Sequence, residues 1–391
     1  MNLERRAMTH PPKFLFVEIN QRCNLRCKHC SYWIRNEVDR ERFMAREERL
    51  AIIGDFARLN PEGIVVTCGG EQMLDAEEYF SVSSVSRALG LQCYSVVNGT
   101  CIQDIETADR MVFDGPTEIT ISLNSHLSEI HDESRGTPGS FVQAVNALRL
   151  LLDARSRHQL NIPIYAMAVL SEDNYRDLED FYDFVLNDIG ADKLKLNFLQ
   201  PTFGGALSHS GGDRYFADHV IKDVRKLKEI IWRCDRRFGL QINRRWLRHV
   251  SMYLRSTSLR CDSIRGWRGR GTWYPICNSY DRNIMLDVYG TARLCFAETF
   301  ESQEIRTRND LVSFWSNRRK NRRRMLSCTR YCGISHSVRL EAATRLRQSA
   351  YRRPAHWPII AFYAIGRRIV LLAGDFLRRS LVRFRKSLRT L

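Results

Sequence analysis

The first half of the chain alternates between short apolar runs and longer amphipathic segments. Six apolar, β-branched runs lie at 14–20, 63–70, 93–99, 117–124, 163–170 and 193–200. Near-continuous apolar runs of this length are typical of strands buried on both faces. Between several of them, apolar residues recur at three- and four-residue spacing, which predicts helices at 46–59, 140–154 and 174–189.

The order of these elements indicates the fold class. Alternating strands and helices predict an α/β fold with a parallel sheet. Ser140 and Asn174 stand at the starts of two predicted helices and are the expected N-caps. Six such units form either an open doubly wound sheet or a partial barrel. In both folds, functional residues lie at the C-terminal ends of the strands.

The alternation ends near residue 225, and the composition changes after it. The segment 260–335 is rich in Cys, Arg and Gly, and the tail after it has thirteen Arg and Lys residues against two acidic ones. We therefore expect an N-terminal extension (1–12), a core (13–225), a cysteine-rich region (226–335) and a basic amphipathic tail (336–391).

The chain carries no recognisable targeting segment. Its N-terminus lacks the apolar stretch of a secretory signal, and no apolar run reaches the roughly 18 residues of a membrane-spanning helix. Twelve cysteines without a signal indicate reduced thiols in the cytoplasm, where clustered cysteines are more often metal ligands than disulfides. We therefore expect a cytoplasmic protein.

The net charge of +17 is concentrated in the tail and in the run 317–324. Basic clusters bind nucleic acid or anionic lipid, or are simply solvated. Nucleic acid is the less favoured partner because the excess charge lies mostly outside the core and no RNA-binding motif is present. In 369–388 apolar residues recur every three to five positions among arginines, which predicts a helix on the inner membrane surface or one packed on the protein's own core.

Three cysteines follow the first predicted strand in the spacing C-x3-C-x2-C: Cys23, Cys27 and Cys30. A structural zinc site is one interpretation, but such sites normally have four protein ligands. His29 lies too close between two of the cysteines to join them easily. An iron–sulfur cluster fits better, because thiolates hold such clusters and three of them leave one iron open to a small molecule.

This motif, on the loop after the first strand, resembles the signature of radical S-adenosylmethionine (radical SAM) enzymes. Gly69-Gly70-Glu71 resembles the GGE segment of that family, 96–100 its NG motif and 119–145 its fourth-strand segment. The resemblance implies a partial (β/α)6 TIM-like barrel. It also implies a [4Fe–4S] cluster on the three cysteines, whose open iron chelates the amino and carboxylate groups of SAM.

The resemblance further implies which residues contact SAM, with the adenine near His29, the amino group at the GGE segment, and the ribose and carboxylate at Ser122 and Arg135. The full set of implied contacts is His29, Gly69, Gly70, Glu71, Asn98, Ser122 and Arg135. Three positions depart from the family pattern: His29 replaces an aromatic residue, Gln72 a proline and Asn124 an acid. Any role that requires a carboxylate at 124 is therefore in doubt.

A second group of cysteines lies in the cysteine-rich region: Cys277, Cys295, Cys328 and Cys332. The glycine in VYG (288–290) predicts a hairpin between the first two. The region resembles the auxiliary-cluster extension called SPASM, or its shorter form, twitch, which implies one auxiliary [4Fe–4S] cluster; a four-cysteine zinc site is the alternative. Cys261 remains outside this group, and three interpretations are open. It replaces one of the four cysteines as a ligand, donates a hydrogen atom as a candidate catalytic residue, or is an inert thiol.

The resemblance implies an enzyme that reductively cleaves SAM to a 5′-deoxyadenosyl radical, with a flavodoxin or ferredoxin as reductant. An auxiliary cluster favours oxidation of the substrate. Because the first predicted strand begins near residue 14, we expect no leader-binding domain before it, which favours a small polar or carbohydrate-type substrate. The alternatives are a peptide- or protein-modifying maturase, an epimerase, a nucleic-acid-modifying enzyme and, outside catalysis, an electron carrier.

Overall fold

The computed structural model describes residues 7, 9–34, 40–200, 210–255, 273–277, 279–295, 302–321 and 338–342. Its main feature is a nine-stranded sheet in the order β10-β9-β8-β1-β2-β3-β4-β5-β6. All six predicted strands are present and pair in parallel in chain order. They are β1 (Phe14–Asn20), β2 (Ile64–Gly69), β3 (Gln92–Val97), β4 (Glu118–Ser122), β5 (Ile164–Leu170) and β6 (Lys193–Phe198). The partial TIM-like barrel expected from the sequence is confirmed.

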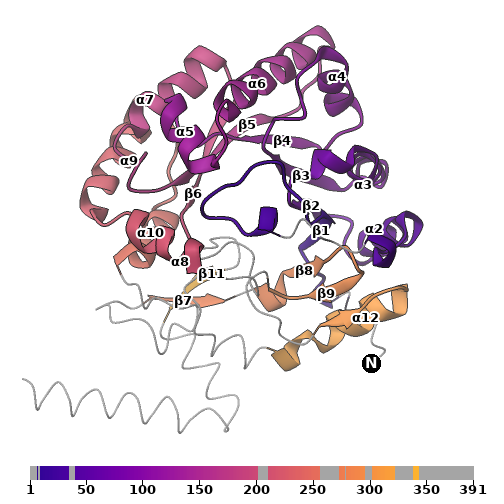
Figure 1. The fold of residues 1–391 in the computed structure, drawn as a ribbon. Coiled ribbons are helices and arrows are strands. Elements are labelled where there is room, and N and C mark those ends of the chain that lie inside the picture. Colours follow the sequence, from indigo (N-terminus) through magenta and orange to yellow (C-terminus); the bar gives the residue numbers. More distant parts are fainter. Residues whose placement is uncertain are drawn as a thin grey trace, which may run out of the picture. The chain divides into compact units, whose positions relative to one another are not determined.

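Helices connect these strands and cover the outer side of the curved sheet (Figure 1). They are α2 (Arg46–Leu59), α3 (Ala76–Ala88), α4 (Ile105–Phe113), α5 (Ser128–Arg135), α6 (Ser140–Arg157) and α7 (Leu178–Asp183), which continues as the π-helix η4 (Phe184–Ile189). On β5, Ala166 and Ala168 are fully buried against the helices, whereas Tyr165 and Met167 on the opposite face are partly exposed. The inner face of the sheet is therefore accessible to a ligand.

Beyond β6 the chain forms three consecutive helices, α8 (Ser210–His219), α9 (Val224–Phe238) and α10 (Arg244–Arg255). A hairpin then returns to the sheet: β8 (Asn283–Leu286) pairs in parallel with β1 and antiparallel with β9 (Thr291–Arg293). Gly290 has a φ of 83° in the bend, where a left-handed backbone favours glycine. The hairpin predicted at VYG is confirmed, and the short β10 (Gln303–Glu304) and α12 (Arg308–Asn317) follow it.

The two predicted N-caps are wrong. Gly139 is the N-cap of α6, and Ser140 is its first helical residue. Asp132 stabilises this helix start instead, because its carboxylate accepts hydrogen bonds from the amide of Gly139 and the hydroxyl of Ser140. The helix predicted at 174 begins four residues later, with Asp177 as its N-cap, because the side chain of Asn174 is bonded to the carbonyls of Asn124, beyond β4, and Val169, in β5.

The chain divides into two compact units. Met1–Arg268 and Pro275–Leu340 form the first, and Gly269–Tyr274 with Glu341–Leu391 form the second. A two-stranded sheet pairs β7 (Trp273–Cys277) with β11 (Val338–Ala342). The predicted membrane-surface helix of the tail lies outside the described residues. Within the described ranges, no helix has both the length and the apolarity needed to cross a bilayer.

Candidate active site

The three cysteines lie on the cysteine loop (residues 21–31), which follows β1 directly. One side of this loop is bonded to the C-terminal end of α5: the amide of Arg26 donates to the carbonyl of Arg135 at 3.1 Å, and that of Lys28 to the carbonyl of Ser134 at 3.3 Å. Gly136 follows at a φ of 63°, and a Cβ there would lie 2.3 Å from the carbonyl oxygen of Arg26. The close approach of the two backbones requires glycine at this position.

The other side of the cysteine loop contacts the GGE segment. The amide of Gly70 donates to the carbonyl of Asn20 at 3.2 Å, and the amide of Glu71 donates to the carbonyl of Arg22 at 2.8 Å. A Cβ on Gly70 would lie 1.8 Å from that same carbonyl oxygen of Arg22. The fold therefore holds the first cysteine next to Glu71 through backbone contacts that exclude any side chain at Gly70.

Glu71 is buried, with 2% of its surface exposed. Its two carboxylate oxygens accept hydrogen bonds from the backbone amides of Asn98 at 2.7 Å and Met73 at 3.1 Å. Burial raises the pKa of Glu71 to about 7, although the two amides and nearby Arg135 oppose the shift. The carboxylate is fixed in orientation and is ready to accept a hydrogen bond from an amino group.

The thiols of the cysteine loop lie close to one another. Burial raises the pKa of Cys23 to about 12 and that of Cys30 to about 11, and in each case neighbouring thiols of the loop add to the shift. A metal that binds here must displace these protons. Within the described residues, no group of three or more His, Cys, Asp and Glu side chains converges on a single metal ion. In an iron–sulfur cluster each thiolate binds a different iron, so the three sulfurs need not converge on one point.

Arg135 is the cation of this site and is 8% exposed. Its Nη1 donates to the sulfur of Cys27 at 3.5 Å, while its buried Nε has no hydrogen-bond partner among the described residues. A buried guanidinium N–H without a partner is costly, and a carboxylate is the ligand that its geometry fits. Burial, and then Arg135, lower the pKa of His29 to about 3, so this imidazole of the cysteine loop is neutral.

The remaining predicted contacts lie at strand ends. The side chain of Asn98 donates to Asn24 of the cysteine loop at 2.9 Å and accepts from the amide of Thr100 at 2.9 Å. Ser122 is the last residue of β4 and is partly buried. The structure therefore brings the first three cysteines together with Glu71, Asn98 and Arg135 at the C-terminal end of the sheet.

Comparison with known proteins identifies the domain that carries this site. Residues 17–185 match the Radical SAM superfamily. The chain therefore contains a radical SAM domain. Similar curated proteins include an AdoMet-dependent heme synthase from Oleidesulfovibrio alaskensis, 30% identical over 208 residues, which are 52% of this chain and 50% of that protein. Another is the antilisterial bacteriocin subtilosin biosynthesis protein AlbA of Bacillus subtilis, 28% identical over 238 residues, which are 56% of this chain and 48% of that protein.

Solved structures show the same fold. SuiB from Streptococcus suis bound to SAM matches with a TM-score of 0.54 and 12% identity, over 80% of this chain and 66% of that one. The enzyme anSMEcpe with bound AdoMet matches with a TM-score of 0.55 and 15% identity, over 81% of this chain and 84% of that one. At these identities the likeness concerns the fold alone. The chain spans about half the length of the curated relatives it matches.

The residues of this radical SAM domain fit the cofactors of its superfamily. Cys23, Cys27 and Cys30 supply three thiols on one loop, as a [4Fe–4S] cluster with an open iron requires. Arg135 offers an unpaired buried N–H for a carboxylate, and Glu71 offers a fixed acceptor for an amino group. These are the two groups through which SAM chelates iron in this superfamily.

Asn124 stands where the radical SAM pattern usually has an acidic residue, and its role is structural. Its side chain donates to Ser134 at 2.8 Å and accepts from the amide of Val169 at 3.0 Å, and its backbone amide donates to Nδ1 of His131 at 3.1 Å. Asn124 therefore links the end of β4 to β5 and to α5. No function that needs a free carboxylate is available at position 124.

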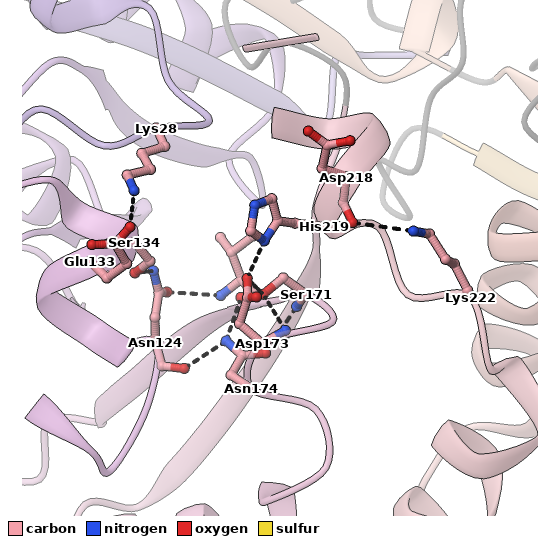
Figure 2. A network of polar contacts seen from close by, with 11 residues as sticks. Lys28, Asn124, Glu133, Ser134, Ser171, Asp173, Asn174, Asp218, His219 and Lys222 are labelled. Atoms are coloured by element: carbon pink, nitrogen blue, oxygen red, sulfur yellow. Dashed lines mark hydrogen bonds and ion pairs between the residues drawn. The ribbon is translucent and has the colours of Figure 1, made fainter. Parts of the chain in front are cut away.

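A second polar network, which the sequence did not indicate, continues from Asn124 toward α8. Figure 2 shows Asn174 between Asn124 and the Ser171–Asp173 turn, with His219 beyond it. Nδ1 of His219 lies 2.7 Å from the carboxylate of Asp173, and the ring of Tyr215 stacks on this imidazole with centroids 4.2 Å apart. This carboxylate–imidazole pair lies just beyond the C-terminal end of β5. Its members lie far apart in the sequence, so no spacing motif could have found them.

The second cysteine group is only partly described. Cys295 follows β9 and is partly buried. Cys277 is the last residue of β7. Cys261, Cys328 and Cys332 lie outside the described residues, so the auxiliary cluster stays a prediction. In the hairpin that precedes Cys295, β8 pairs with β1, the strand that leads into the cysteine loop, and β9 is one strand further from it.

His131 predicts a pH dependence of stability. Burial, and then the charge of Arg135, lower its pKa to about 3, against about 6.5 in the unfolded chain. Below pH 6.5 the unfolded chain binds a proton that the folded protein excludes, so this contribution is complete above pH 6.5 and is lost as the pH falls toward 3. Between pH 7.5 and pH 5 the free energy of unfolding should fall by about 2 kcal/mol because of this group.

Urea unfolding of the cluster-free protein at the two pH values measures this. A His131→Gln variant, although less stable at pH 7.5, should lose about 2 kcal/mol less on acidification than the wild type. His158, a partly buried histidine paired with Asp109 on another part of the fold, provides the comparison substitution. An equal acid-induced loss in wild type and His131→Gln would contradict the assignment.

Proposed function

We propose that this protein is a SAM-cleaving enzyme whose [4Fe–4S] cluster is held by Cys23, Cys27 and Cys30. When bound, the reduced cluster and SAM supply a 5′-deoxyadenosyl radical that abstracts a hydrogen atom from an organic substrate. The observation that carries the proposal is the cysteine loop itself. It is bonded on one side to Glu71 and on the other to Arg135, whose buried Nε is unpaired.

Within this site each residue has a separate task. Glu71 accepts a hydrogen bond from the SAM amino group, and Arg135 binds the carboxylate. Gly69 and Gly70 bring the backbone against the cysteine loop, while His29, Asn98 and Ser122 border the nucleoside. Burial of these groups excludes water from the radical and fixes their orientation before SAM arrives.

The substrate would occupy the inner face of the sheet. That face is polar: Lys195 on β6 forms an ion pair with Glu118 on β4, and its ammonium lies 4.4 Å from the ring centroid of Tyr165. Hydrogen-bonding groups beside an aromatic ring suit a small polar or carbohydrate-type substrate. We propose its oxidation, in which a proton leaves to a base such as His219 and an electron leaves to an iron–sulfur acceptor.

Other substrate classes give distinct outcomes. The names of the relatives specify heme synthesis and biosynthesis of the bacteriocin subtilosin, so a porphyrin or a peptide is the alternative. Radical epimerisation would leave the substrate mass unchanged in ordinary water, whereas oxidation removes two hydrogens. Modification of nucleic acid is the least favoured outcome. A flavodoxin- or ferredoxin-type protein would supply the electron.

The test is anaerobic reconstitution followed by iron analysis and incubation with dithionite and SAM. Formation of 5′-deoxyadenosine and methionine should depend on SAM and on the reductant. Its absence from a fully reconstituted protein would exclude the proposed function. Candidate sugars, peptides and porphyrins are then compared by how far each one accelerates this cleavage and which of them changes mass.

The auxiliary cluster is tested separately by its stoichiometry. Two four-iron clusters correspond to about eight iron atoms per chain, and a Cys295→Ser variant should retain about four. Because Cys295 lies outside the cysteine loop, SAM cleavage should survive in this variant. Cys101, another partly buried thiol, is the control, and its serine variant should keep all the iron. Four iron atoms in the wild type would exclude a second four-iron cluster.

A further inference from the structure

Arg22 precedes Cys23 in the sequence, and its side chain binds Asp75, the residue that ends the turn after Glu71. Its Nη2 donates to Asp75 Oδ1 at 2.8 Å and its Nε to Asp75 Oδ2 at 3.2 Å, while Nη2 also lies 2.8 Å from the carbonyl of Leu74. Asp75 closes the short helix η3 (Gln72–Asp75), which Glu71 begins as N-cap. The guanidinium group of Arg22 therefore binds the far end of the turn that begins at Glu71.

Asn20 supports the same contact from β1. It is 1% exposed, and its side-chain amide donates to the carbonyl of Glu71 at 2.8 Å and to Asp75 Oδ2 at 3.0 Å. One carboxylate thus receives donors from both Asn20 and Arg22. Its Oδ2 is shared between the end of β1 and the start of the cysteine loop.

We infer that Arg22 and Asp75 are positioning residues that set the distance between the cysteine loop and Glu71, so that one SAM molecule reaches both. The inference rests on the proposed function, because it concerns how this chain holds the two halves of that site. Cys23 follows Arg22 directly, and Glu71 is three residues before Leu74. A shift of the Arg22–Asp75 contact therefore moves the thiolate of Cys23 relative to the carboxylate of Glu71, the proposed acceptor for the SAM amino group.

An ordinary surface ion pair would not set the distance between the cysteine loop and Glu71. Exposed pairs contribute about 0–1 kcal/mol and tolerate exchange of arginine for lysine. The side chains of Arg22 and Asp75 are 40% and 19% exposed, and the fork bonds two carboxylate oxygens and a carbonyl at once. The single ammonium of lysine cannot reproduce these directions. The site therefore depends on the directions of these hydrogen bonds and not on the positive charge of Arg22 alone.

The neighbouring pair of Glu77 and Arg110 supplies a matched control. Glu77 lies in the first turn of α3, two residues after Asp75, and Arg110 donates to its two oxygens at 2.7 and 3.1 Å. This fork has the same chemistry but joins α3 to α4, on the outer side of the sheet. Loss of it should leave the distance between the cysteine loop and Glu71 unchanged.

The experiment compares reconstituted wild type, Arg22→Gln, Arg22→Lys, Asp75→Asn and Arg110→Gln. Iron content should be equal in all five proteins. The dissociation constant of SAM, measured by equilibrium dialysis, should rise at least tenfold in the first three variants and less than twofold in Arg110→Gln. The change that SAM causes in the electron paramagnetic resonance spectrum of the reduced cluster should shrink in the same three variants.

The outcomes separate the two proposals. A wild-type protein that holds no cluster or binds no SAM defeats the proposed function itself. If the wild type binds SAM and Arg22→Gln and Asp75→Asn bind it equally well, the positioning role is wrong. Recovery of normal SAM affinity in Arg22→Lys would also overturn it, because charge alone would then suffice. Loss of the cluster in both Arg22→Gln and Asp75→Asn would overturn it too, since the pair would then be needed to form the cysteine loop.

Discussion

Replacement of Cys23, Cys27 and Cys30 together with alanine should reduce 5′-deoxyadenosine formation to the background of cluster-free protein. The three thiols are the ligands proposed for the cluster that reduces SAM, and all three lie on the cysteine loop. The variant should lose about four iron atoms per chain. Iron analysis and chromatography of the nucleoside products measure the two effects.

Cys93 provides the control for this triple variant. It lies on β3 within the hydrophobic core and is fully buried, so its thiol is remote from any ligand role. Cys93→Ala should destabilise the protein modestly through a small cavity and leave the iron content and the SAM cleavage per cluster unchanged. Persistent 5′-deoxyadenosine formation by the triple variant would show that the cluster is assigned to the wrong cysteines.

Gly70→Ala should abolish SAM binding and lower the stability of the fold. The new methyl group would lie 1.8 Å from the carbonyl oxygen of Arg22, which belongs to the backbone and cannot rotate away. The turn must therefore move, and the hydrogen bond from the amide of Glu71 to that carbonyl must lengthen or break. Overpacking of this kind costs about 1–3 kcal/mol. Thermal unfolding and SAM dialysis measure the two effects.

Gly54 is the matched control for this substitution. It lies within α2, and a Cβ there would meet no atom within 4 Å. Because alanine is favoured over glycine inside a helix, Gly54→Ala should stabilise the protein by about 0.5–1 kcal/mol and bind SAM normally. Normal SAM affinity in Gly70→Ala would mean that the GGE turn is not part of the cofactor site.

Hydrophobic periodicity predicted the architecture of the core because buried parallel strands are nearly continuous apolar runs. Each of the six predicted strands is present, and α2 matches its predicted range of 46–59. Helix starts were predicted less well. At α6 the N-cap is Gly139, and the carboxylate of Asp132 stabilises the helix start. The side chain of Asn174 is bonded to Asn124, a contact distant in the sequence, and the helix begins after it, at Leu178.

The candidate site divides in the same way. The spacing of Cys23, Cys27 and Cys30 and the GGE segment are local patterns, so the sequence alone located both halves of the site. Asn124 was recognised as a departure from the family pattern, but its structural role depends on partners in two other elements, α5 and β5.

The sequence by itself determined the strand order along the chain, the cysteine loop and the residue types available to hold a cluster and SAM. Only the tertiary structure decided that the hairpin of β8 and β9 pairs with β1, that His219 meets Asp173, and that Arg22 forks onto Asp75. The physical reason is range. Periodicity and motif spacing record contacts within one element or one loop, whereas ion pairs and strand pairing join residues whose separation along the chain carries no pattern.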